Sequence, residues 1–65
     1  MTEEQLNFAN IWMGLFNHDY VAIEHQLQIK RASGSYNIDG FSSDEADEIW
    51  EYIDGIVQEN LYGAT

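Results

Sequence analysis

The chain has 65 residues, of which 12 are Asp or Glu and only 2 are Lys or Arg, giving a net charge of -10. At this length we expect one domain over residues 1–65, and the absence of cysteine excludes disulfides and thiolate zinc sites as a source of stability. Because phosphate groups and anionic membranes are bound by clustered Lys and Arg, the charge also excludes nucleic acid and membrane surfaces as direct ligands.

The composition nevertheless indicates a folded protein. Hydrophobic residues make up 45% and aromatic residues 14% of the chain, more than is typical of a disordered chain. The expected core aromatics are Phe8, Trp12, Phe16, Tyr36 and Trp50. The opening Met1-Thr2-Glu3-Glu4 has neither the basic region nor the apolar stretch of a secretion signal. We therefore expect a cytoplasmic protein, in the host cell cytoplasm if a phage encodes it.

Residues 3–16 are predicted to form the first helix. Thr2 and Gln5 have the spacing of a capping box, and Glu3 and Glu4 are favourably placed in the first turn. Apolar residues cover most of the helical circumference and leave only a narrow polar strip. This apolar surface is wider than one small core can bury, so we expect part of it to form an interface.

The segment from Tyr20 to Phe41 supports two interpretations. Apolar residues at alternate positions from Val21 to Ile29 are typical of a half-buried strand. A turn at Ser33-Gly34 would make residues 20–41 a β-hairpin, which is the favoured prediction. The alternative is a helix from Asp19 to Ser33, with Asp19 as N-cap and Gly34 just beyond the C-terminus.

Residues 43–61 are predicted to form an amphipathic helix. Ser42 and Glu45 have the spacing of a capping box. Apolar residues from Ala46 to Val57 form one stripe. The opposite face carries five carboxylates, which we call the acidic ridge: Asp44, Asp47, Glu48, Glu51 and Asp54.

Together these elements predict an α+β fold with the order helix–β-hairpin–helix (α-β-β-α), and the alternative is an all-α three-helix bundle. Because a lone two-stranded hairpin is marginally stable, both helices would have to cover its apolar face. We expect a homodimer formed through the first helix, a strand edge, or both. The residues expected at the dimer interface are Ile11, Trp12, Met13 and Phe16.

The sequence contains no motif typical of an enzyme. His18 is expected in a turn and His25 on the inward side of the strand, and their spacing does not indicate a metal site. Residues 35–46 partly resemble an EF-hand loop, with glycine at the sixth position, but the twelfth position is Ala46 instead of the required glutamate. We therefore expect no catalysis, no cofactor and no metal.

The acidic ridge carries the main functional hypothesis. Like charges four residues apart on a helix cost a few tenths of a kcal/mol each, and no Lys or Arg lies within this helix to offset them. We expect a small inhibitor or regulator that imitates nucleic-acid charge and occupies the basic groove of a nucleic-acid-binding protein, with Tyr52, Glu45 and Glu59 at the rim. Bacteriophages and mobile elements typically use such proteins against restriction, CRISPR or transcription machinery. The alternative is a generic acidic interaction or scaffolding module that acts through the apolar face of the first helix.

Overall fold

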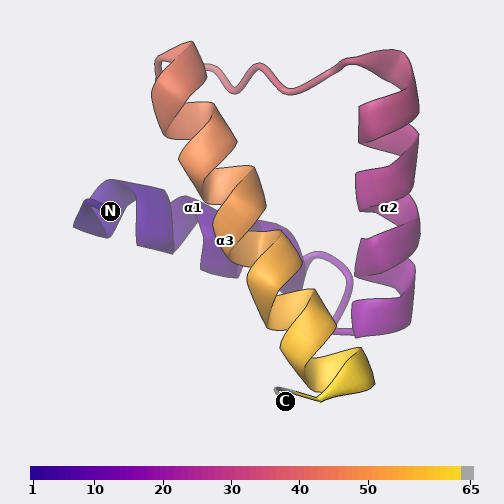
Figure 1. Ribbon diagram of the computed structural model, residues 1–65. Coiled ribbons are helices and arrows are strands. Elements are labelled where there is room, and N and C mark those ends of the chain that lie inside the picture. Colours follow the sequence, from indigo (N-terminus) through magenta and orange to yellow (C-terminus); the bar gives the residue numbers. More distant parts are fainter. Residues whose placement is uncertain (64–65) are drawn as a thin grey trace.

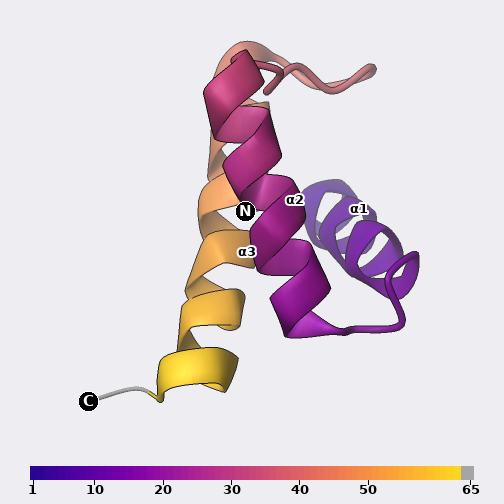
Figure 2. The same cartoon turned by 90° about the vertical axis from the view of Figure 1, so that its right-hand side faces the viewer.

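The computed structural model describes residues 1–63, which fold into three helices and contain no strand (Figure 1). Helix α1 spans Glu3–Gly14, α2 spans Tyr20–Ser33 and α3 spans Ser43–Tyr62. Helix α3 packs against both of the others. It runs antiparallel to α2 and crosses α1, and Figure 2 shows α2 in front with α3 and α1 on either side of it.

Helices α1 and α3 begin at the predicted capping boxes. The backbone N–H of Gln5 donates to Thr2 Oγ1 over 3.3 Å, and the backbone N–H of Thr2 donates to Gln5 Oε1 over 2.7 Å. At the start of α3, Glu45 and Ser42 make the same reciprocal pair at 3.2 and 2.9 Å. These bonds satisfy donors that the first helical turn leaves free, and they fix where each helix starts.

The predicted β-hairpin is wrong, because the segment forms α2. The Asp19 carboxylate accepts bonds from the backbone N–H groups of Val21 and Ala22, as an N-cap does. At the other end Gly34 has φ 70°, the left-handed conformation that ends a helix. The fold is therefore the three-helix alternative and not α+β, and residues 35–42 connect α2 to α3.

The alternation of apolar residues between Val21 and Ile29 wrongly predicted a strand. Its four aliphatic residues do not share one environment in the structure. Ile23 and Leu27, one helical turn apart, are buried in the core. Val21 and Ile29 instead face outward, with 65% and 48% of their surface exposed. A helix that contributes only a narrow buried stripe to a small core has weak helical periodicity in its sequence.

The core lies where α3 faces the other two helices. Its buried residues are Ala9, Met13, Ile23, Leu27, Ile49, Trp50, Ile53 and Val57. The Trp50 ring makes edge-to-face contacts with Phe8 and Trp12, at centroid distances of 6.1 and 5.0 Å. Of the five aromatic residues expected in the core, Trp50 belongs to it, and the other four are partly buried and pack against it.

Candidate functional site

The acidic ridge of α3 is divided by its surroundings. Asp44, Asp47, Glu48 and Glu51 are exposed, whereas Asp54 is half-buried. Since α3 is continuous from Ser43 to Tyr62, residues four apart place their Cβ atoms about 5–6 Å from each other. Asp44 with Glu48, and Asp47 with Glu51, therefore form two neighbouring pairs of carboxylates.

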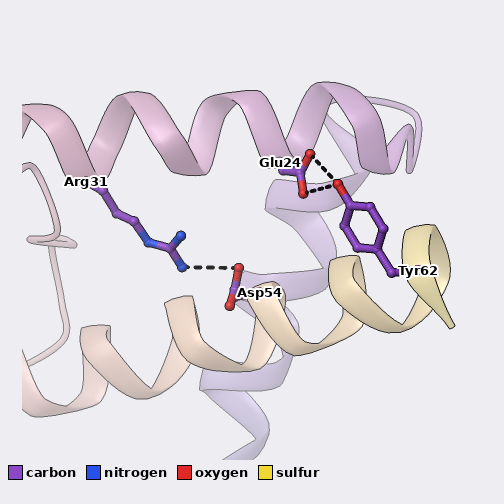
Figure 3. A network of polar contacts seen from close by, with 4 residues as sticks. All are labelled: Glu24, Arg31, Asp54 and Tyr62. Carbon is purple, nitrogen blue, oxygen red and sulfur yellow. Dashed lines mark hydrogen bonds and ion pairs between the residues drawn. The ribbon is translucent and has the colours of Figure 1, made fainter. Parts of the chain in front are cut away.

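Both cationic side chains of the protein, Lys30 and Arg31, are directed toward α3. A guanidinium nitrogen of Arg31 lies 3.2 Å from a carboxylate oxygen of Asp54 (Figure 3). The ammonium nitrogen of Lys30 lies 4.9 Å from the centre of the Trp50 ring, within range of a cation–π interaction. This compensation comes from the last turn of α2, so the spacing of charges within the third helix could not predict it. Since Lys30 and Arg31 are the only Lys and Arg of the sequence, no other such side chain is left to pair with the exposed ridge carboxylates.

A cleft of about 250 Å³ lies between α2 and α3, beside the Arg31–Asp54 pair. The residues that line it are Leu27, Arg31, Tyr36, Asp47, Trp50, Glu51 and Asp54. Three of the five ridge carboxylates thus border the cleft, and Asp44 and Glu48 do not. The Trp50 indole N–H donates to the backbone oxygen of Tyr36 over 2.8 Å, which holds the 35–42 connection against this part of α3. We call this feature the acidic cleft.

A second polar contact joins the far ends of the two helices. The Tyr62 hydroxyl lies 3.0 and 3.2 Å from the two carboxylate oxygens of Glu24 and donates to them (Figure 3). This hydrogen bond, together with repulsion from the Glu24 charge, raises the pKa of Tyr62 above its ordinary value. Together with Arg31–Asp54, the contact links α2 to α3 at two places on the surface.

The three predicted rim residues lie in different environments. Tyr52 is half-buried and packs against the core. Glu45 is half-buried, and its carboxylate accepts the backbone N–H of Ser42 in the capping box. Glu59 is exposed on the last turns of α3. None of the three lines the acidic cleft.

The four residues expected at a dimer interface are also divided. Met13 is only 2% exposed and belongs to the core, while Trp12 and Phe16 are half-buried with their rings 5.0 Å apart. Ile11 is 67% exposed, and Leu15, one turn further along, is 72% exposed. Leu15 is the C-cap residue of α1, and we call Ile11 and Leu15 together the apolar face of α1. Leu15 is not among the four residues that the sequence predicts at the interface.

The two histidines that were considered for a metal site, His18 and His25, are both exposed. Within residues 1–63, no three His, Asp or Glu side chains come together in a way that could hold a metal ion. His25 was expected to face inward but is exposed on the outer side of α2, because the segment is a helix and not a strand. His18 lies in the turn between α1 and α2, with φ 55°.

Among residues 1–63, none of the helices has the length and apolar character that crossing a membrane requires. No protein-family model, curated protein or solved structure matches the chain. Function is therefore inferred from the residues and their geometry.

Proposed function

We propose that this protein is a small acidic interaction module that binds another protein through the apolar face of α1. The observation that carries the proposal is the exposure of Ile11 and of Leu15, the C-cap residue of α1 four positions further along. A pair of large aliphatic side chains on one helix face is the kind of feature that inserts into a groove of a partner. Of the other apolar residues of α1, Ala9 and Met13 are buried in the core, and Phe8 and Trp12 pack against it.

The charge of the module selects a basic partner. The net charge is -10, and both cations are already in contact with α3. Complementary charge speeds the encounter with a basic surface and disfavours acidic partners, while the apolar contact supplies affinity. The proposal gives the protein no catalytic role, and it includes self-association through the same face, which makes a homodimer.

The test is capture of partners from a lysate of the cells that make the protein. Replacing Ile11 and Leu15 by serine is expected to abolish capture, because it removes the exposed aliphatic surface without touching the core. The matched control replaces Val21 and Ile29 by serine, since these are the exposed aliphatic residues of α2. Equal capture by the two double variants would show that the apolar face of α1 is not the contact.

A second candidate function is imitation of nucleic-acid charge by the acidic ridge. It is supported by the separation of charges, because the exposed carboxylates Asp44, Asp47, Glu48 and Glu51 have no cation in contact with them within residues 1–63. Captured partners should then be released by rising salt and displaced by DNA or RNA. Charge reversal at Asp47 and Glu51 should abolish binding, and so should reversal at Asp44 and Glu48. Partners whose binding is unaffected by salt and by added nucleic acid would rule out this second function.

A further inference from the structure

We infer that the acidic cleft between α2 and α3 binds the guanidinium group of an arginine in a basic partner protein. This inference rests on the part of the proposed function that gives the protein a basic partner, and it names the side chain that the partner presents. It does not depend on the apolar face of α1, which lies on a different helix.

The cleft already contains a guanidinium from the protein itself. Arg31 lines it and pairs with Asp54 at 3.2 Å. Guanidinium is planar and weakly hydrated, and it combines hydrogen bonding to carboxylates with stacking on aromatic rings. The cleft therefore already accommodates one guanidinium beside Asp54.

Two carboxylates in the cleft remain for a second guanidinium. Asp47 and Glu51 line the cleft one helical turn apart, and neither makes an ion pair within residues 1–63. Their spacing of about 5–6 Å between Cβ atoms lets both side chains reach one planar group that carries five N–H donors. A charge-assisted contact of this kind is stronger than a bond between neutral groups.

The remaining walls are aromatic and aliphatic. Trp50, Tyr36 and Leu27 line the cleft together with the carboxylates. The hydrogen bond from the Trp50 indole to the Tyr36 carbonyl oxygen fixes the position of the connection at this point. Such walls cover the aliphatic stem of an arginine, whose apolar surface would otherwise stay in water. A space of about 250 Å³ accommodates one such side chain and not a folded segment.

The contact made by Arg31 is weak enough to yield to a ligand. The side chains of Arg31 and Asp54 are 56% and 31% exposed, and exposed ion pairs contribute only about 0–1 kcal/mol. An incoming arginine can thus share the cleft with Arg31 or displace it from Asp54. Removal of Arg31 is expected to strengthen ligand binding, by up to about fivefold, because it removes a like charge and frees Asp54.

The experiment is an NMR titration with three blocked tripeptides, glycine–X–glycine, in which X is arginine, lysine or citrulline. The signal followed is the indole N–H of Trp50, with the indole of Trp12 as internal comparison. The arginine peptide is expected to shift the Trp50 signal saturably. The citrulline peptide has nearly the same shape without the charge, and it should bind at least about tenfold more weakly. The lysine peptide should fall between them.

Two double variants with equal loss of charge separate a specific cleft from general attraction. Asp47→Asn with Glu51→Gln should weaken arginine binding at least about tenfold, because both changes lie in the cleft. Asp44→Asn with Glu48→Gln removes the same charge from the same helix outside the cleft, and it should change affinity less than about twofold. Circular dichroism and thermal unfolding check that both variants keep the fold. The Arg31→Gln variant tests the displacement, and weaker binding by it would contradict the assignment.

The inference is overturned if the Trp50 signal does not shift saturably, if the two double variants weaken binding equally, or if lysine binds more tightly than arginine. Its failure is distinct from failure of the proposed function, because the titration uses defined peptides and the capture experiment uses changes on α1. Arginine binding combined with capture that is unaffected by the α1 substitutions would support the cleft and place the partner contact there.

Discussion

The side-chain amide of Gln5 donates a hydrogen bond to the backbone oxygen of Glu45, 3.1 Å away across a separation of 40 residues. Each residue is the third position of its own helix and completes the capping box there. The bond therefore ties the N-terminus of α1 to the N-terminus of α3. Gln5 is only 2% exposed, and it is the one buried polar side chain within residues 1–63.

The Gln5→Glu substitution separates the capping role from this contact between helices. Glutamate still accepts the backbone N–H of Thr2, but it presents a carboxylate where the Glu45 carbonyl oxygen needs a donor. We expect a loss of about 1–3 kcal/mol in the free energy of unfolding, because the substitution buries a carboxylate against a carbonyl oxygen that cannot donate to it. Urea unfolding followed by circular dichroism measures it. Stability equal to that of the parent protein would show that only the capping box matters.

Trp50 is expected to contribute more to the stability of the fold than Trp12, the other tryptophan. Trp50→Phe keeps an aromatic ring in the core but removes the donor to the Tyr36 carbonyl oxygen, so the 35–42 connection should loosen and stability should fall by roughly 2 kcal/mol. Trp12→Phe is the matched control, since Trp12 is only half-buried, and it should cost less. Thermal unfolding of both variants compares them, and the opposite order of stability would contradict this role for Trp50.

Replacing a glycine by alanine should have opposite effects on the free energy of unfolding at Gly34 and at Gly55. Gly34→Ala places a side chain at φ 70° and should destabilise the protein by about 1 kcal/mol, although there is space for the methyl group. Gly55 lies within α3 and also has open space around it, so Gly55→Ala should stabilise by about 0.5–1 kcal/mol. Chemical denaturation gives both values. Stabilisation by Gly34→Ala would be incompatible with a helix that ends at this glycine.

The contact between Tyr62 and Glu24 predicts a change in stability at high pH. The hydrogen bond to the Glu24 carboxylate, and then repulsion by its charge, raise the pKa of Tyr62 above the ordinary value of about 10. The contact therefore stabilises the fold fully below about pH 10, and this contribution is lost as pH rises through the raised pKa of the folded state. Isotope-edited NMR of labelled tyrosine follows the titration.

The Glu24→Gln variant is the control for that titration. Glutamine can still accept a hydrogen bond from the Tyr62 hydroxyl, but it carries no charge. The pKa of Tyr62 should therefore return toward its ordinary value. An identical Tyr62 titration in the variant and the parent protein would mean that the contact does not persist in solution.

The parts of the fold that local rules determine could be predicted from the sequence. The starts of α1 and α3 follow from Thr2 with Gln5 and from Ser42 with Glu45, because a capping box involves residues only three positions apart. The nature of α2 could not be settled in this way. Asp19 and Gly34 are the right caps for a helix, but Gly34 is also a good hairpin residue, and the decision depends on which side chains α3 buries.

The candidate site was predictable only in part for the same reason. The acidic ridge follows from helical spacing, since its members lie on one helix. The pairing of Asp54 with Arg31, and the cleft beside it, depend on how α2 lies against α3, which no pattern within one helix determines. The exposure of Ile11 and Leu15 likewise depends on which part of the wide apolar surface of α1 meets the core.

The most direct test of the proposed function is the affinity of the purified protein for a captured partner, measured by calorimetry for the parent and for the two serine double variants. The change of Ile11 and Leu15 to serine should weaken binding at least about tenfold, whereas the change of Val21 and Ile29 should leave the affinity nearly unchanged. Equal affinities for all three proteins would contradict an interaction module that acts through the apolar face of α1.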